Sequence, residues 1–290
     1  MKKILLLILM TLPGLASALS LQATTPQALA SISSFSNPLW VGLGNSANIS
    51  PVFKFGRSTN VDATSTDIWD GANATLDQDI WLAPTAARIH AIVSSSTDDD
   101  GSPVGVGART LRIWGLVDWD TSESSEDIIM NGITPVNTVN SYVIIHRMEV
   151  LTSGTTKINV GIIKATAAVD STITAQILVD QGQTSMAIYG ASSNDTFCLT
   201  GGGGSLNAGG GSTKLSDNRF LYNKDPANRP TVFSTIDTEG LNTAGTSNFT
   251  RAYIPYRCFQ GPLIVKGQSF GSTTNLDVSI YFQGFLVRVN

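Results

Sequence analysis

Short runs of alternating or continuous apolar residues repeat along most of the chain from Val52 onward. The runs are rich in Ile and Val, they recur at spacings of about ten residues, and turn clusters such as TDDDGSP and TSGTT separate them. A period of two places successive side chains on opposite faces of a strand, whereas a helical period is convincing nowhere beyond the N-terminal region. The pattern therefore predicts an all-β protein, and strands of this length and spacing are typical of a sandwich or a barrel.

The turn signal Asp180-Gln181-Gly182 divides this pattern. We expect two antiparallel, jelly-roll-like β-sandwich domains, the first over residues 52–180 and the second over residues 181–290. One continuous double sheet is the alternative. Residues 19–51 are rich in Ser, Ala, Thr and Asn and contain one short helical pattern, TPQALASISSF. We expect an N-terminal arm there that packs on a neighbouring subunit or serves as a linker.

Residues 1–18 have the three parts of a secretory signal peptide. Lys2 and Lys3 precede an apolar run over residues 4–12, and the small residues Ala16-Ser17-Ala18 end the segment. The apolar run is shorter than the roughly 20 residues that a membrane-spanning helix needs. Cleavage after Ala18 would deliver the protein to the periplasm or the exterior, and the alternative is a retained hydrophobic leader.

A series of ordered motifs carries a family resemblance. Phe53 to Gly71 reads FKFGRSTNVDATSTDIWDG and is followed by IHAIVSSSTDDDG, GARTLRIWGL, MNGITPVNTVNSYVIIHRM and QGQTSMAIY. This series, which ends at Tyr189, resembles β-rich virion structural proteins of tailed bacteriophages, especially phages of marine bacteria. Near the C-terminus, YIPYRCFQGPLIVKGQ and TNLDVSIYFQGFLVRV are similar to the closing pair of strands in that family.

The resemblance implies a non-enzymatic structural protein of a phage-like virion, in a capsid decoration, a tail or an appendage. Proteins of this kind cover their exposed strand edges by symmetric association, so we expect a homo-oligomer in contact with other virion proteins. Analogy with other β-rich viral appendages favours a trimer. The implied location is the virion, whereas the predicted signal peptide favours a secreted or periplasmic protein, and both locations stay open.

Charge narrows the range of partners. Charged residues make up 14% of the chain, against about 25% in typical proteins, and the net charge is −4. No basic run occurs beyond Lys2-Lys3, whereas a nucleic-acid surface needs clustered Lys and Arg. We therefore expect no nucleic-acid partner and an outward-facing role.

Candidate catalytic groups are few. His90 and His146 both lie in the middle of apolar runs, where we expect structural or surface histidines that face a sheet surface. Glu123, Glu126 and Asp127 cluster around a turn, and two carboxyl groups about 5 to 10 Å apart can hydrolyse glycosides. A solvated hairpin is the alternative. We expect no catalytic residue and no cofactor, and we keep a glycoside hydrolase as a less favoured hypothesis.

Acidic turns offer possible metal ligands. Asp98, Asp99 and Asp100 precede Gly101, and such oxygen clusters on turns can hold a structural calcium ion. The spaced ligands of an EF-hand are missing, and a turn solvated by its own aspartates is favoured. In the segment DATSTDIWDG we expect turn-forming aspartates around a buried Trp69.

Exposed tryptophans would support a different function, because aromatic rings stack on sugar rings. Trp114 lies within an apolar strand and is expected in the core, whereas Trp119, between two aspartates, is the best candidate for an exposed surface contact. A secreted protein that binds a host-surface glycan is therefore the leading alternative, although an exposed Trp119 would equally suit a contact between subunits.

Two further features concern the C-terminal half. Cys198 and Cys258 are the only cysteines, and export to an oxidising compartment would favour a disulfide bond between them, whereas cytoplasmic assembly would leave two buried thiols. The glycine-rich interval Thr200–Thr213 has no Lys-Ser or Lys-Thr ending and no helix after it, so it does not match a phosphate-binding loop. We expect a flexible loop tip or linker there.

Overall fold

The computed structural model describes residues 48–73, 78–207 and 213–288. The predicted leader at 1–18 and almost all of the predicted arm at 19–51 lie outside these residues. Within the described ranges the protein is all-β, as predicted, with a single 3₁₀ turn, η1 (Asp70–Ala72), as its helical element. No helix in this part of the chain is long and apolar enough to cross a membrane.

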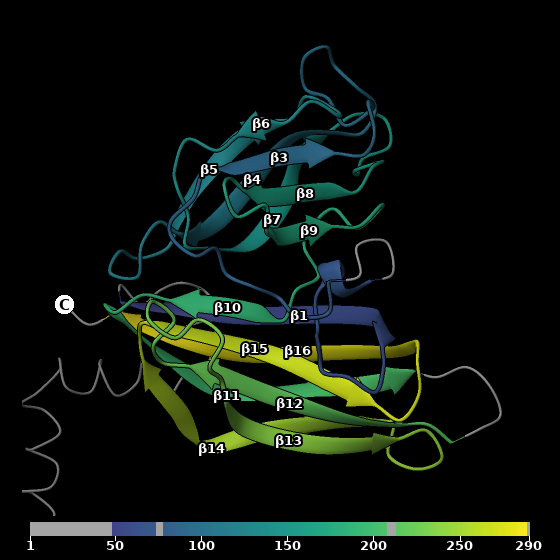
Figure 1. Cartoon of the computed structure of the whole chain (residues 1–290), viewed down its shortest axis with the longest axis vertical. Coiled ribbons are helices and arrows are strands. Elements are labelled where there is room, and N and C mark those ends of the chain that lie inside the picture. The colour runs from purple at the N-terminus through teal and green to yellow at the C-terminus, as the bar shows by residue number, and fades with distance from the viewer. Residues whose placement is uncertain (1–47, 74–77, 208–212, 289–290) are drawn as a thin grey trace, which may run out of the picture. The chain divides into compact units, whose positions relative to one another are not determined.

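The first sandwich contains two antiparallel sheets, with strand orders β6-β3-β8-β9 and β5-β4-β7 (Figure 1). Residues from both sheets share one core, in which Ile92 and Ile163 meet Leu111, Ile113 and Met148. Alternation in the burial of β3 and β8 gives each strand one inward face, as a period of two requires. The strands are β3 (His90–Ser94), β4 (Ala108–Leu116), β5 (Ser124–Ile129), β6 (Val136–Asn137), β7 (Ile144–Ser153), β8 (Ile163–Ala167) and β9 (Ile173–Ile177).

The second sandwich also contains two antiparallel sheets, with orders β1-β16-β11-β14 and β10-β15-β12-β13, and a short β2 pairs with β15 (Figure 1). Its core joins Phe197 and Phe282 from one sheet to Phe220 and Val265 from the other. The strands are β1 (Ile49–Val61), β2 (Thr66–Asp67), β10 (Ile188–Ala191), β11 (Asp195–Asn207), β12 (Leu215–Asn223), β13 (Ser234–Asn242), β14 (Asn248–Gln260), β15 (Leu263–Gly271) and β16 (Leu276–Arg288).

Strand pairing does not follow the chain in the way that we expect from the sequence. We expect residues 52–180 to form the first sandwich, whereas β1 and β2 hydrogen-bond with β16 and β15 near the C-terminus. The reason is physical: alternation identifies a segment as a strand but carries little information about its partner. Residues 52–290 form one compact unit, and a domain boundary at Gln181 stays a prediction.

Four consecutive glycines, Gly201–Gly204, lie buried in β11 between β14 and β16. The prediction of a flexible loop over Thr200–Thr213 is therefore wrong for this run. A Cβ atom on Gly202 would lie only 2.7 Å from the ring of Phe220, so the missing side chain is what admits the aromatic ring. Glycine in a strand interior often marks such a close approach, and here it belongs to a central strand.

Candidate functional site

The outer face of the β1-β16-β11-β14 sheet carries exposed aromatic side chains. Along β1, Phe53, Phe55 and Arg57 are exposed, whereas Lys54 and Gly56 between them are buried. Strict alternation along the strand puts the two phenylalanines on the same face, with exposed fractions of 59% for Phe53 and 37% for Phe55. Large apolar side chains grouped on one exposed face are typical of a contact surface.

The neighbouring strand β16 extends this surface. Phe53 and Tyr281 have ring centroids 6.0 Å apart with planes tilted by 32°, and Phe53 and Phe55 have centroids 6.1 Å apart with a tilt of 35°. A Cβ atom on Gly203 would lie 2.7 Å from the Tyr281 ring, so this ring lies over β11 where glycine leaves room. We call Phe53, Phe55 and Tyr281 the aromatic strip.

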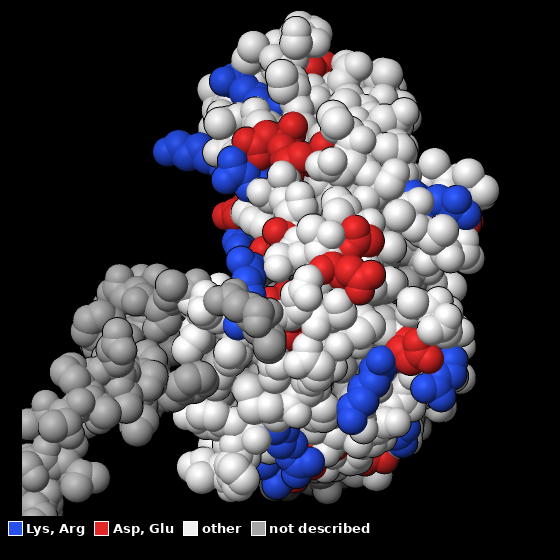
Figure 2. Space-filling view, turned by 90° about the vertical axis from the view of Figure 1, so that its left-hand side faces the viewer, with Lys and Arg blue, Asp and Glu red and all other residues white. Residues whose placement is uncertain are grey.

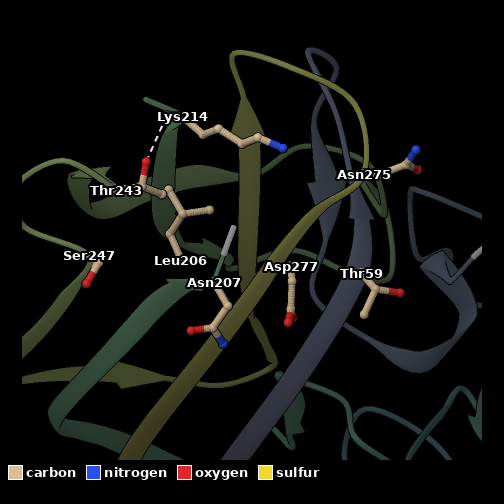
Figure 3. Close-up of a pocket in the computed structure, with 8 residues that line it drawn as sticks. All are labelled: Thr59, Leu206, Asn207, Lys214, Thr243, Ser247, Asn275 and Asp277. Carbon is tan, nitrogen blue, oxygen red and sulfur yellow. Dashed lines mark hydrogen bonds between the residues drawn. The ribbon is translucent and has the colours of Figure 1, made fainter. Parts of the chain in front are cut away.

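A polar pocket lies at one end of the same sheet (Figure 3). Its volume is about 600 Å³, and most of the residues that line it have side chains that can donate or accept hydrogen bonds. The residues come from the ends of β1, β11 and β16, from the start of β12 and from the turn between β13 and β14. They are Thr59, Leu206, Asn207, Lys214, Thr243, Ser247, Asn275 and Asp277.

The aromatic strip and the pocket are continuous along two strands. On β1, Thr59 follows the exposed positions of Phe53, Phe55 and Arg57 at the same spacing of two. On β16, Asp277 lies opposite Arg57, since the Arg57 guanidinium donates to both Asp277 carboxylate oxygens at 2.8 and 2.7 Å. The outer face therefore leads from the aromatic rings through one ion pair to the pocket.

Charge in the pocket is unbalanced. Arg57 neutralises Asp277, and this hydrogen-bonded contact raises the pKa of Arg57 above its ordinary value. Lys214 is held through its backbone N–H, which donates to the Thr243 hydroxyl at 2.9 Å, and its side chain reaches across the pocket (Figure 3). Among the described residues, no acidic side chain forms an ion pair with Lys214.

On the face of the molecule that Figure 2 presents, basic and acidic side chains are interspersed among mostly uncharged residues. No single sign of charge dominates this face. The whole chain carries a net charge of −4, which disfavours an acidic ligand. Attraction for such a ligand therefore has to come from individual Lys or Arg side chains.

The inward side of β1 contributes to a buried ionic cluster. The Lys54 ammonium donates to the backbone carbonyl of His146 in β7, and the His146 Nε2 atom lies 2.5 Å from the Glu123 carboxylate. Burial lowers the pKa of Lys54 to about 7, while Glu123 opposes this shift and Arg147 adds to it. Burial also lowers the pKa of His146 more than Glu123 raises it. The cluster joins a strand of one sandwich to a strand of the other.

A second buried pair links β2 to β15. The Lys266 ammonium lies 2.6 Å from the Asp67 carboxylate, which also accepts hydrogen bonds from Gln268 and from the backbone N–H of Trp81. Burial raises the pKa of Asp67 more than Lys266 lowers it. Because both side chains are almost completely buried, with exposed fractions of 4% and 0%, the pair anchors the fold and offers no open site.

Both histidines are buried, with exposed fractions of 0% for His90 and 2% for His146. Of the two expected alternatives, structural or surface histidines, the structure has the structural one, because each ring packs against other side chains. Burial lowers the pKa of His90 to about 4, and its Nδ1 atom lies 2.9 Å from the Arg88 carbonyl. The His146 ring packs on Tyr189, with ring centroids 4.6 Å apart.

The three carboxylates of the glycosidase hypothesis bind three separate partners. Glu123 contacts His146, Glu126 accepts from the Val139 backbone N–H at 2.9 Å, and Asp127 pairs with Arg112 at 2.6 Å. Neighbouring residues along β5 point to opposite faces, so Glu126 and Asp127 cannot converge on one bond. Glu126 and Asp127 are therefore not the pair that the glycosidase hypothesis needs.

The three aspartates of the acidic loop, Asp98, Asp99 and Asp100, lie in different environments. Asp99 is fully buried and accepts hydrogen bonds from the backbone N–H groups of Ala108, Val160 and Gly161, with the Ser94 hydroxyl as a fourth donor at 2.6 Å. These donors occupy the carboxylate, which therefore acts as a loop anchor. Asp98 is exposed, and Asp100 accepts from the backbone N–H of Ser102. No group of three or more acidic, histidine or cysteine residues within the described ranges is placed to hold a metal ion.

The tryptophans do not form an exposed platform within the described ranges, which exclude Trp40. Trp69 is fully buried, as predicted. Trp119 is half-buried and packs against the first core. Trp114, expected in the core, is instead half-buried beside two guanidinium groups, with Arg147 4.6 Å and Arg112 5.9 Å from its ring centre. Phe53 and Phe55 are exposed instead, and the alternation in FKFGR is the signal that would have found them.

Cys198 and Cys258 are joined by a disulfide bond between β11 and β14. They occupy directly opposite positions in the antiparallel register, with Cα atoms 4.0 Å apart. Cys198 is buried whereas Cys258 is exposed. The bond therefore fastens the edge strand β14 to the central strand of its sheet.

Beyond this disulfide bond, β14 leaves its regular pairing. Arg257 lies opposite Leu199 and Ala252 lies opposite Gly201, so the four residues Tyr253–Tyr256 face a single position on β11. This stretch, which we call the apolar bulge, exposes Ile254 by 89% and Tyr256 by 43%. A bulge interrupts the hydrogen-bonding ladder and pushes side chains outward.

Comparison with known proteins assigns no family: no family model matches this chain, and no curated protein matches it. Among solved structures, one similar chain belongs to infectious bursal virus derived T=1 particles. That chain is 9% identical, the match covers 84% of this chain and 73% of the other, and the TM-score is 0.18. The similarity is weak, and it carries no argument about function.

Proposed function

We propose that this protein is a non-enzymatic structural component of a phage-like virion that acts through homo-oligomeric assembly. The observation that carries the proposal is the apolar bulge, Tyr253–Tyr256, on a strand at the edge of its sheet. An isoleucine exposed by 89% beside a tyrosine exposed by 43% is a costly surface for a monomer, and association with a second copy would cover it. Closed symmetric assembly is the usual solution among soluble homo-oligomers.

The sequence motifs support the same proposal. The ordered series from Phe53 to Tyr189 and the closing strands near the C-terminus resemble phage virion structural proteins. The protein would act in a capsid decoration, a tail or an appendage, as a trimer in contact with other virion proteins. If residues 1–18 direct export, an exported subunit would join the particle, or the protein would act outside it as a secreted or periplasmic protein.

The assembly proposal is tested by sedimentation of the wild-type protein and of an Ile254→Asp variant. The wild type should form a homo-oligomer at micromolar concentration, and the buried charge should weaken association by about tenfold or more. Val169→Asp is the matched control, because Val169 is exposed by 84% at a turn in the first sandwich. A monomeric wild-type protein would contradict the assembly proposal, and so would an Ile254→Asp variant that associates as strongly as the control.

The particle proposal needs a separate measurement. Peptide mapping of native material by mass spectrometry should find the chain enriched in density-purified particles relative to the soluble envelope fraction. The first residue detected shows whether the leader is removed, and a start at Leu19 within particles would mean that an exported subunit joins the assembly. Recovery in the envelope fraction alone would overturn the virion assignment.

Glycan binding is a second candidate function. Trp119 does not support it, because that ring is half-buried against the first core. The observation in its favour is the aromatic strip beside a polar pocket on the second sandwich.

A further inference from the structure

We propose that the aromatic strip and the neighbouring pocket together bind an acidic oligosaccharide. The aromatic strip lies on β1 and β16 and the pocket lies at one end of the sheet, whereas the apolar bulge interrupts β14 at Tyr253–Tyr256. The inference therefore stands on different residues from the assembly proposal, and either one can fail without the other.

The aromatic strip matches the apolar face of a sugar ring. The tilts of 35° and 32° between successive rings are far from the perpendicular packing that is common in cores, so the three rings form a shallow, continuous surface. Gly203 permits this arrangement, because a side chain there would collide with the Tyr281 ring. Rings that lie along a strand direction suit a chain of sugar units better than a single compact ligand.

The pocket supplies the polar half of the site. Asn207, Thr243, Ser247 and Asn275 line a space of about 600 Å³ and can both donate to and accept from sugar hydroxyls. An apolar partner such as a peptide helix would leave these groups without hydrogen bonds, which costs free energy when they lose contact with water. A ligand with apolar ring faces and many hydroxyl groups satisfies both parts of the surface.

Charge determines the class of oligosaccharide. Lys214 forms no ion pair with a described acidic residue, and the carboxylate of Asp277 is already held by two hydrogen bonds from Arg57. The pocket therefore presents an ammonium group without a partner in the described part of the chain. A uronate carboxylate or a sulfate on the sugar would provide one.

The proposal is tested with the full-length protein on a printed array of uronate-containing, sulfated and neutral oligosaccharides. We expect binding to acidic members of the array and weaker binding to their neutral counterparts. A Phe53→Ala, Phe55→Ala double variant should lose about tenfold or more in affinity for every bound member. Lys214→Gln should remove the preference for acidic members by a similar factor while binding to neutral ones changes little.

Two control variants keep the test specific. Val169→Ala changes an exposed apolar position in the first sandwich, outside both the aromatic strip and the apolar bulge, and should leave array binding intact. Lys157→Gln removes an exposed lysine from the first sandwich and should change nothing. Circular dichroism and thermal unfolding of each variant establish that it is folded.

Several results would overturn the inference. One is a wild-type protein that is folded and assembled but binds no oligosaccharide on the array. Another is an oligomeric state that changes with the Phe53→Ala, Phe55→Ala variant instead of glycan binding, which would make the aromatic strip a contact between subunits. Equal binding of acidic and neutral members by the wild type would overturn the role of Lys214.

Discussion

The strands β1 and β14 form the two edges of one sheet, and they differ in how they present their unpaired backbone groups and side chains. β1 keeps strict alternation from Val52 to Thr59, so one face enters the core and the other presents Phe53 and Phe55. β14 breaks its pairing at Tyr253–Tyr256 and exposes side chains on both of its faces. A regular edge strand preserves a flat surface of side chains. A bulged edge strand hinders the addition of another strand, so a partner protein would contact its side chains instead of its backbone.

The two edges are also attached by interactions of different strength. A disulfide bond holds β14 to the central strand β11. β1 is held to β16, on its outer face, by the exposed ion pair between Arg57 and Asp277 and by the contact between Phe53 and Tyr281. A covalent link restricts the unfolded chain, while an exposed ion pair contributes little. We therefore expect loss of the disulfide bond on β14 to lower the free energy of unfolding far more than loss of the ion pair on β1.

The largest effect is expected when Cys198 and Cys258 are both replaced by alanine. The bond closes a loop with a sequence separation of 60, and the chain-entropy model gives a loss of about 4 kcal/mol in the free energy of unfolding. Urea unfolding of the variant and of the oxidised wild type measures this loss. Hydrogen exchange should increase in β14 before it increases in β1, and equal exchange in both edges would contradict the comparison.

A somewhat smaller effect is expected when the strand between these edges is overpacked. In Gly202→Leu the new side chain meets the Phe220 ring and the backbone of Tyr281, so we expect a loss of about 3 kcal/mol in the free energy of unfolding. The matched control is Gly245→Leu, since a Cβ atom at Gly245 has no neighbour within 4 Å. If the midpoint temperature of thermal unfolding falls equally in both variants, the packing argument is wrong.

The glycine run Gly201–Gly204 is a segment whose structure could not be predicted from local sequence patterns. Four glycines predict a flexible segment by composition, yet Gly201–Gly204 form a buried central strand. The information that overrides the composition is carried by Phe220 and by Tyr281, which are distant in sequence and occupy the space above and below the strand. No local pattern reveals that pairing, because the partners meet only after folding.

Other parts of the structure were accessible from the sequence for equally physical reasons. Alternating Ile and Val runs predicted the all-β sandwich fold, since burial on one face of a strand imposes a period of two. Burial of Trp69 was predicted because it is the one large aromatic residue in a segment of turn-forming aspartates. The pocket was not predictable, because its lining residues come from five separate regions of the chain that only the strand order brings together.

The inward face of β1 provides a test that depends on pH. Burial lowers the pKa of Lys54 to about 7, below its value in the unfolded chain, so the unfolded state binds more protons between these two values. Stability should therefore rise with pH, by about 2 kcal/mol between about pH 7 and about pH 9. Lys54→Met should be more stable than the wild type near pH 7 and should show a much smaller rise.

Denaturant unfolding at several pH values measures this difference, and Lys157→Met, at an exposed lysine, should retain the wild-type rise. Glu123, His146, Arg147 and Tyr189 are the other charged or titratable groups in and beside the cluster, and they remain in both variants. If the Lys54→Met variant keeps the full rise, the pH dependence belongs to other groups and the lysine on β1 is charged in the folded protein.

The smallest effect on stability is expected from Arg57→Ala, which removes the ion pair between β1 and β16. The Arg57 side chain is 59% exposed, so the loss in the free energy of unfolding should stay below about 1 kcal/mol. Arg229→Ala is the matched control, because it removes a similarly exposed pair with Asp225.

The two variants should differ in their affinity for acidic oligosaccharides, since Arg57→Ala leaves the Asp277 carboxylate uncompensated in the pocket. Binding of acidic oligosaccharides should weaken in Arg57→Ala alone, and an equal loss in both variants would mean that the pocket does not select for charge.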